Sequence, residues 1–449
     1  MELSIKKKTS NMLNDKQKKL KILFRGWIYV PHSYAIVNCF QLIHLYKNFN
    51  DRIDIYVQEM PYFNPEWNNK RKLVYTDEYN EIIKNFKVWD GTSDVTFDLI
   101  YNQTFPYNIN VTSLDINIPK CVFYTSEFAK IGPEYFTIEL PPNTNLNTSE
   151  LKSNYIKTFL SEFKNIYFTS PSIWSSQGMK DYLINVDCLV KRNRIITHGV
   201  DTSIFYYKKN NSSRDAIRKM YNVKDTDVLM VSIGAMTKNK GILVILQALN
   251  HIVNVEKRTN FKLLLKGTGD LYKSQQFLEI YFDELTKYDL IKKEHLDNLM
   301  NYIIFTNNTL SFSMMNDLFN ASDVYLAPYL AEGFCLAPLE SLASGLNVIV
   351  PKTGSTKEYI EDIYKNGGQD LIHYVDSFIM LDSNTKYLQN NIDVSNLVKT
   401  ILENESKFKN PKDNYEKMKE FIEKEYSWNK VSELLYKYFC DIIDDVSKE

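Results

Sequence analysis

The sequence predicts an α/β protein made of two Rossmann-like domains, each with a doubly wound parallel sheet. Short apolar runs alternate with segments of helical spacing, both halves of the chain show this alternation, and a polar break at 206–215 separates them. Short β-branched runs of near-continuous hydrophobicity are typical of strands buried on both faces of a parallel sheet. Strand–helix alternation implies right-handed βαβ units, so we expect a cleft between two such domains.

The expected strands fall into two series of six. They lie at 21–25, 53–57, 98–101, 121–125, 166–169 and 194–197, and at 228–234, 262–267, 302–306, 323–328, 347–350 and 377–381. Helical spacing follows many of them, as in "GILVILQALNHIVNVEK" (241–257). The last segment, "SWNKVSELLYKYFCDII" (427–443), predicts an amphipathic helix that begins at a serine N-cap.

These patterns divide the chain into four expected parts. They are a basic, disordered tail at 1–19, an N-terminal domain at 20–205, a C-terminal domain at 206–426 and a closing helix at 427–449. The basic tail is of the kind that is solvated, and contact with anionic lipid stays open.

Composition excludes several classes of protein. A net charge of -1 and a pI near 6.6 give no electrostatic footprint for nucleic acid. The five cysteines form no C-x-x-C pair, so we expect neither a zinc site nor a disulfide framework, and a reducing, cytoplasmic location. The sequence shows neither a signal peptide nor a run of about 18 apolar residues, so no transmembrane segment is expected.

Candidate ligand-binding residues follow the strands of the second half. Ligands of open α/β sheets bind beyond the carboxyl ends of the strands. Gly234 follows the first strand, and Lys240 then opens a helix, where free N–H groups and the dipole favour a phosphate. Lys266 follows the second strand. Thr306 ends the third, where backbone groups could form hydrogen bonds with the edge of a nucleotide base.

The fourth strand leads into "AEGFCLAPLESLASG" (331–345). Glu332 and Phe334 lie in the expected loop, the amides of Cys335 and Leu336 could hold a phosphate, and Glu340 lies in the first two helical turns. Two carboxylates so placed can bind two sets of hydroxyls. The pattern predicts a nucleotide-diphosphate sugar as co-substrate and no further cofactor.

In that hypothesis the lysines neutralise the pyrophosphate. Lys240, helped by Lys266, faces the two phosphates. Glu340 accepts hydrogen bonds from the ribose hydroxyls, and Glu332 accepts them from the sugar. We expect catalysis by positioning and electrostatics, with Glu332 and Lys240 as the catalytic residues and no metal.

The chain resembles the family-4 retaining glycosyltransferases of the GT-B type. "PYLAEGFCLAPLESLASGLNVIV" resembles their E-x₇-E signature, "SIGAMTKNKG" their G-R-L-x-x-x-K-G loop, and "IITHGVDTSIF" their interdomain segment. "PHSYAIVNCFQL" and "FYTSEFAKIGPEYF" resemble segments of their acceptor domain. The resemblance implies a GT-B fold, a C-terminal helix that crosses back onto the first domain, retention of configuration, and a carbohydrate, lipid or glycoprotein acceptor. It also implies roles at the acceptor side of the cleft for Ser33, Glu127 and His198.

Two departures keep an alternative open. Ala235 replaces the arginine of the glycosyltransferase loop, so the alternative is a catalytically impaired nucleotide-sugar-binding or partner subunit. Glu127 stands where many relatives carry a histidine, which we interpret as a subfamily trait. An epimerase or a phosphorylase on the same fold is a further alternative, but a phosphorylase needs a lysine-bound pyridoxal phosphate and a much longer chain. A dinucleotide oxidoreductase is disfavoured because "FRGWIYVPHS" lacks G-x-G-x-x-G, and "DTD" (225–227) precedes a strand, so we expect a turn and not a metal site.

Overall fold

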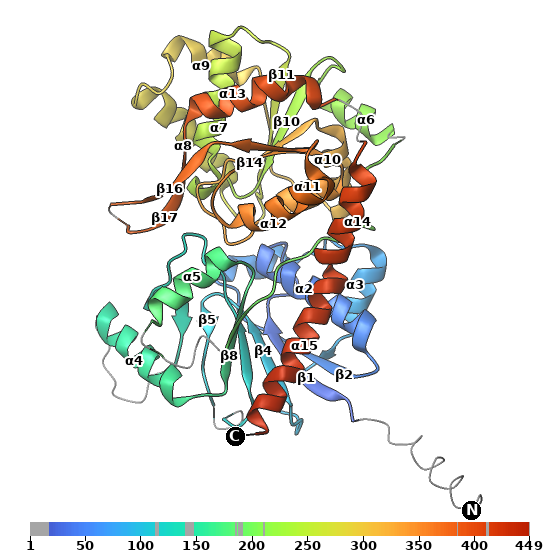
Figure 1. Cartoon of the computed structure of the whole chain (residues 1–449), viewed down its shortest axis with the longest axis vertical. Coiled ribbons are helices and arrows are strands. Elements are labelled where there is room, and N and C mark those ends of the chain that lie inside the picture. The colour runs from blue at the N-terminus through green and yellow to red at the C-terminus, as the bar shows by residue number, and fades with distance from the viewer. Residues whose placement is uncertain are drawn as a thin grey trace, which may run out of the picture.

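The computed structural model of the chain describes residues 18–112, 116–139, 148–184, 186, 192–209, 212–383, 385–409 and 413–448. Within these ranges two parallel sheets, one in each half of the chain, are covered by helices and face each other end to end (Figure 1). The predicted α/β class with two doubly wound domains is confirmed. The first 17 residues of the predicted tail, and Cys188, lie outside the described part.

The N-terminal sheet has the strand order β3-β2-β1-β4-β6-β8-β9, with parallel pairing throughout. Its strands are β1 (Leu20–Gly26), β2 (Ile53–Glu59), β3 (Lys87–Val88), β4 (Leu99–Gln103), β6 (Lys120–Phe123), β8 (Ile166–Ser170) and β9 (Asn193–Ile195). The helices are α2 (Ser33–Phe49), α3 (Asp77–Lys84), α4 (Ser149–Glu162) and α5 (Ile173–Tyr182), and a small pair joins β5 (Tyr107–Asn108) to β7 (Phe136–Thr137). The edge strand β3 was not predicted, because its two residues are exposed and carry no apolar pattern.

The C-terminal sheet has the order β12-β11-β10-β13-β14-β15, also parallel. Its strands are β10 (Val228–Ile233), β11 (Phe261–Lys266), β12 (Ile303–Thr306), β13 (Val324–Leu326), β14 (Asn347–Pro351) and β15 (Ile372–Val375). Its helices are α6 (Ser212–Met220), α7 (Ile242–Asn250), α8 (Ser274–Lys287), α9 (Lys293–Met300), α10 (Phe312–Ala321), α11 (Leu336–Ala343), α12 (Ser355–Ile363), α13 (Val394–Asn404) and α14 (Tyr415–Glu425). The chain order reverses between β10 and β13, so the loops after these two strands meet at one crevice.

One predicted strand lies elsewhere. Residues 377–381 form β16 (Ser377–Leu381), which pairs antiparallel with β17 (Leu388–Ile392) in a hairpin outside the main sheet. The last sheet strand is β15, whose histidine and tyrosine hide its strand character in the sequence. Phe378 and Leu381 are exposed, so this apolar run is not a buried strand.

The predicted C-terminal helix is α15 (Trp428–Val446), and it crosses from the C-terminal domain onto the N-terminal domain (Figure 1). The Ser427 hydroxyl accepts a hydrogen bond from the Lys430 amide at 3.2 Å, as an N-cap does. The helix packs on α2, where the Tyr436 ring stacks on Phe49 with centroids 4.3 Å apart. None of the described helices combines the length and the apolar character needed to cross a bilayer.

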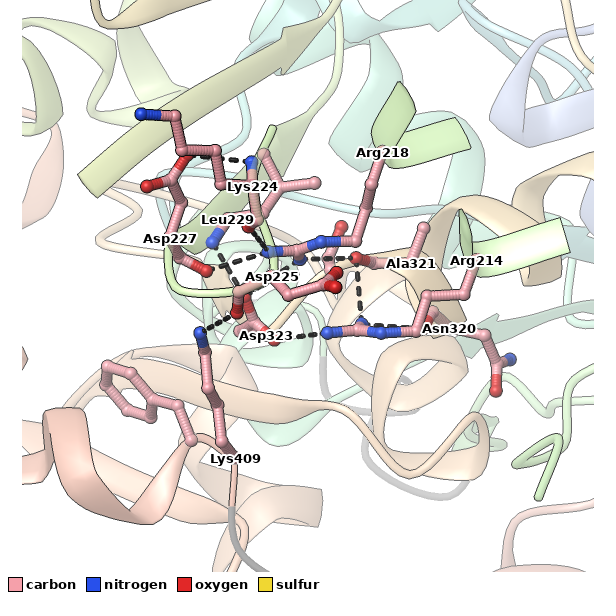
Figure 2. A network of polar contacts seen from close by, with 12 residues as sticks. Arg214, Arg218, Lys224, Asp225, Asp227, Leu229, Asn320, Ala321, Asp323 and Lys409 are labelled. Carbon is pink, nitrogen blue, oxygen red and sulfur yellow. Dashed lines mark hydrogen bonds and ion pairs between the residues drawn. The ribbon is translucent and has the colours of Figure 1, made fainter. Parts of the chain in front are cut away.

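A buried ionic network ties together the amino-terminal edge of the C-terminal sheet (Figure 2). The Asp323 carboxylate accepts hydrogen bonds from Arg218 and Arg214, each at 3.1 Å, and from the Leu229 amide at 2.8 Å. The Arg218 guanidinium also donates to the carbonyls of Ala321, Lys224 and Asp227. A hollow of about 600 Å³ lies beside this network, at the edge of the sheet opposite the carboxyl ends of its strands. It is lined by groups that are paired with each other, such as Arg214 and Asp323.

The two domains are in contact across the crevice. A Cβ on Gly333 would come within 1.9 Å of the Thr125 hydroxyl, so only glycine permits this approach of the β13–α11 loop to the N-terminal domain. The Ser172 hydroxyl donates to the Gly333 carbonyl at 2.6 Å. Across the same junction, the Glu358 carboxylate of α12 accepts the first two amides of α5, from Ile173 and Trp174, at 2.7 Å each. The crevice is therefore closed at this end.

Candidate active site

A cavity of about 500 Å³ lies between the domains, at the carboxyl ends of the C-terminal strands. It brings together eight of the residues predicted from the sequence. They are Ser33, Glu127, Gly234, Lys240, Lys266, Cys335, Leu336 and Glu340. Both domains contribute to its wall, so any ligand in it would contact the N-terminal and C-terminal domains together.

Lys240 reaches the cavity because of a tight turn after β10. Residues 238–240 form a 3₁₀ turn, and Gly241 follows with φ +69°. A Cβ at Gly241 would lie 2.1 Å from the Pro328 carbonyl oxygen, so the turn can pack against the end of β13 only with glycine there. This packing places the Lys240 ammonium in an ion pair with the Glu332 carboxylate.

One cation and two carboxylates form a cluster beside the cavity, with Lys240 and Glu127 on its wall and Glu332 paired with Lys240. Burial, the largest single effect, lowers the pKa of Lys240, but the charge and hydrogen bond of Glu332, with the charges of Cys335 and Glu127, together outweigh it and raise that pKa. The side-chain amide of Asn239 reaches both carboxylates, with Glu127 at 3.3 Å and Glu332 at 3.4 Å. Burial, and then the charge of Glu332, raise the pKa of Glu127 to about 7, while Lys240 opposes the rise. Glu127 can thus exchange a proton near neutral pH.

Two further ionisable groups, one basic and one acidic, face the cavity. Lys266 is only 6% exposed, and burial lowers the pKa of its ammonium to about 8. Glu340 is partly buried, and burial raises the pKa of its carboxyl to about 8. In the described part of the chain, neither group has an ion-pair partner within 4.0 Å. Desolvated charges of this kind are costly unless a ligand supplies partners.

Helix α11 points its amino terminus at the same cavity. Cys335 precedes the helix with φ +66° and ψ 111°, a conformation that costs a non-glycine residue energy and that clusters at functional sites. Cys335, Leu336 and Ala337 line the cavity. The amino end of a helix attracts anions, so this wall suits a phosphate next to Lys240 and Lys266.

Four predicted residues are not on the cavity wall. Glu332 lies behind Lys240, and Phe334 stacks on Tyr359 with centroids 4.6 Å apart. The Thr306 carbonyl accepts the Gly267 amide at 2.7 Å, so this group serves the local fold. His198 does not line the predicted cleft: it packs against Phe334 at 5.0 Å, and burial lowers its pKa to about 3.

Three residues at the site were missed from the sequence. Asn239 joins the two carboxylates, and His32 and Tyr272 line the cavity from opposite domains with a 2.9 Å contact between ring nitrogen and hydroxyl. Asn239 was within reach of prediction, because it precedes Lys240 in the same turn. The pairing of residues 240 positions apart leaves no signal in a single sequence.

Glu340→Gln is expected to gain stability over the wild type as pH rises. The native pKa of Glu340, about 8, lies above its ordinary value of 4.5, so between these values the native carboxyl keeps a proton that the unfolded chain loses. Raising the pH through this window therefore destabilises the wild type, and glutamine does not titrate. Melting temperatures at pH 5, 7 and 9 test this: the difference should grow up to about pH 8 and then level off. A constant difference would contradict a desolvated Glu340.

Residues 227–377 match the family model described as "Glycosyl transferases group 1". The chain is 23% identical over 201 residues to an uncharacterized glycosyltransferase, MJ1607, of Methanocaldococcus jannaschii, covering 44% of this chain and 47% of that protein. It is 26% identical over 157 residues to the lipopolysaccharide 1,2-N-acetylglucosaminetransferase of Salmonella typhimurium, covering 35% and 38%. The matches thus span less than half the length of these curated relatives.

Solved structures match over nearly the whole chain. A glycosyltransferase from Rickettsia africae superimposes with a TM-score of 0.62 at 14% identity, covering 95% of this chain and 99% of that chain. Anabaena HepE in complex with UDP and glucose superimposes with a TM-score of 0.57 at 12% identity, covering 94% and 99%. At such identities the likeness establishes the fold. Residues 227–377 therefore match the glycosyl transferases group 1 family model, and the chain as a whole has the GT-B fold of solved glycosyltransferase structures such as the Rickettsia africae protein.

Proposed function

We propose that the chain is a metal-independent, retaining glycosyltransferase of family 4 that transfers a hexose from a UDP- or GDP-linked donor to a carbohydrate, lipid or glycoprotein hydroxyl. The observation that carries the proposal is the pair of desolvated ionisable groups, Lys266 and Glu340, on the wall of one cavity that also holds Lys240 and the start of α11. A nucleotide-diphosphate sugar has the matching groups, with phosphates for the lysines and ribose hydroxyls for the carboxylate.

The proposed chemistry rests on positioning and electrostatics. The bond between the anomeric carbon and the diphosphate oxygen breaks, and the acceptor oxygen bonds to the same face of that carbon. Lys240, Lys266 and the α11 amides stabilise the charge that develops on the leaving diphosphate, which takes the acceptor's proton. Glu332 stands next to Lys240, where its charge offsets the positive charge that develops on the sugar. The closed crevice keeps water from competing with the acceptor.

Two relatives support a nucleotide-sugar donor. The Salmonella relative is named as an N-acetylglucosaminetransferase, and HepE was crystallised with UDP and glucose. Of the two glutamates of the E-x₇-E resemblance, Glu340 lines the cavity that such a donor would fill, and Glu332 is paired with the cavity residue Lys240. Free buried cysteines, such as Cys39 and Cys121, accord with a cytoplasmic location.

A nucleotide panel tests the proposal. UDP, GDP, TDP and their glucose or mannose derivatives are added at about 100 times the dissociation constant, where one bound ligand stabilises the native state by about 2.7 kcal/mol. We expect one diphosphate to raise the melting temperature and its nucleoside, which lacks the phosphates, to have little effect. Melting curves that are the same with every nucleotide as without one would refute the proposal.

The second candidate function is a binding subunit without turnover, and Ala235 is the observation that favours it. Arginine at that position would add a cation beside Gly234, and its absence leaves Lys240 and Lys266 to hold the diphosphate. Donor consumption separates the two functions: release of the nucleotide from its sugar identifies an enzyme, and binding alone identifies a subunit.

A further inference from the structure

Tyr272 belongs to the C-terminal domain, but its surroundings belong to the N-terminal domain. The loop after β11 inserts between aromatic side chains, and the Trp67 indole donates to the Leu271 carbonyl at 3.1 Å. The Tyr272 ring lies 5.8 Å from the Trp67 ring and 6.1 Å from the His32 ring. Tyr272 is therefore fixed in this position only while the domains are together.

His32 determines which way the Tyr272 hydroxyl donates. The Nδ1 atom of His32 caps α2 by accepting the Tyr34 amide at 3.2 Å. Burial lowers the pKa of His32 to about 4, so the ring is neutral at pH 7 and its single proton is on Nε2. Nε2 lies 2.9 Å from the Tyr272 oxygen and donates to it. The Tyr272 proton consequently remains for a partner other than His32.

Glu127 supplies the complementary group from the opposite domain. Tyr272 and Glu127 line the same cavity, and in the described residues no hydrogen bond joins them. Burial, and then the charge of Glu127, raise the pKa of Tyr272 to about 12, and Lys240 opposes this rise. The Tyr272 phenol is thus protonated and can donate a hydrogen bond, and the Glu127 carboxylate can accept one. The two groups face the same cavity from different domains.

We propose that Tyr272 and Glu127 together hold the acceptor hydroxyl before transfer. Its oxygen accepts from the Tyr272 phenol while its proton faces the Glu127 carboxylate, and at transfer that proton passes to the leaving diphosphate. An alcohol both accepts and donates, so it satisfies the two groups at once, whereas a phosphate would meet the charge of Glu127. His32 acts as a positioning residue through Tyr272. The inference rests on the proposed function. It assigns the binding of the acceptor substrate to a hydrogen-bond donor, Tyr272, and a hydrogen-bond acceptor, Glu127, from different domains.

Donor hydrolysis tests the inference without knowledge of the natural acceptor, since water then occupies the same place. UDP-glucose, UDP-N-acetylglucosamine and GDP-mannose serve as probes, and nucleotide release is measured. Tyr272→Phe keeps the ring packing but removes the donor, and we expect kcat/KM to fall about 10-fold, with affinity for the nucleotide diphosphate within 2-fold of the wild type. His32→Asn keeps an N-cap acceptor for the Tyr34 amide but is too short for Tyr272, so we expect a similar fall.

The double variant separates positioning from general damage. If His32 acts through Tyr272, adding His32→Asn to Tyr272→Phe lowers kcat/KM no further, so the double variant has the same kcat/KM as Tyr272→Phe alone. Tyr415→Phe is the matched control, because it also removes a buried phenol, bonded to the Ala343 carbonyl at 2.8 Å, away from the cavity. It should leave hydrolysis unchanged.

The outcomes distinguish this inference from the proposed function. Unchanged hydrolysis in Tyr272→Phe, or additive losses in the double variant, overturns the inference alone. Nucleotide binding by the wild type without any donor turnover also overturns it. No nucleotide binding by the wild type overturns the proposed function and the inference with it.

Discussion

Lys240→Met is expected to lower donor turnover by about 10²–10³-fold, the usual cost of removing one group that stabilises developing negative charge. Lys240 is the cation that borders the cavity, the start of α11 and the Glu332 carboxylate together. Methionine fills a similar volume without charge, so the loss isolates the electrostatic part. Lys238→Met is the matched control in the same turn, because Lys238 is exposed. Turnover of Lys240→Met within 3-fold of the wild type would contradict the role of Lys240.

The same substitution is expected to destabilise the fold in a pH-dependent manner. Without Lys240 the carboxylates of Glu127 and Glu332 lose their cation, so the pKa of Glu127, already raised to about 7, moves further up. Below about pH 4.5 Glu127 is protonated in both the folded and the unfolded protein. The stability that the raised native pKa contributes is lost as the pH rises through that pKa. The loss in melting temperature should thus be smallest near pH 5 and largest above pH 7. Lys240→Met with Glu332→Gln should recover stability at pH 8 but not turnover.

Asp323→Ala is expected to destabilise the protein by about 3–5 kcal/mol, because it leaves a buried arginine without its counter-ion. Arg218 and Asp323 have side chains only 2% and 3% exposed, and the carboxylate joins α6 to the first residues of β10 and β13. Asp323→Asn keeps the shape and one acceptor oxygen, so its effect should be smaller. Chemical denaturation measures both.

Two controls sharpen this prediction. Lys365→Ala removes an exposed pair with Glu361 in α12 and should leave stability unchanged, since solvent screens such pairs. The network lies at the amino-terminal edge of the sheet, opposite the cavity, so folded Asp323→Ala should bind nucleotide as the wild type does. A wild-type denaturation midpoint for Asp323→Ala would contradict the account of the network.

The fold could be predicted because it depends on local patterns. Buried parallel strands carry β-branched runs, and the break at 206–215 lies between the two sheets. The hairpin at 377–392 was the exception, because apolar side chains on an exposed β-strand look like core residues in a sequence. Strand order and the pairing of distant loops follow from packing, and no single stretch of sequence records them.

The candidate site could be predicted only where its residues follow strands. Gly234 follows β10 and Lys266 ends β11, while Lys240 and Glu340 lie in the segments that come after β10 and β13, so topology brings them to one cavity. Tyr272 and His32 meet because two domains close on each other, which a sequence pattern does not encode. His198 was expected in the cleft on the strength of its neighbours in the sequence, but the aromatic rings around it hold it in the core.

Glu358 gives the closed state an energetic bias of its own. Its carboxylate accepts the first two amides of α5 in the other domain, beside the Ser172 hydroxyl that caps the Ser175 amide, so separating the domains would expose these two amides to water. Opening of the crevice would therefore have to break these two hydrogen bonds, so the closed state is favoured by a contact that lies outside the cavity.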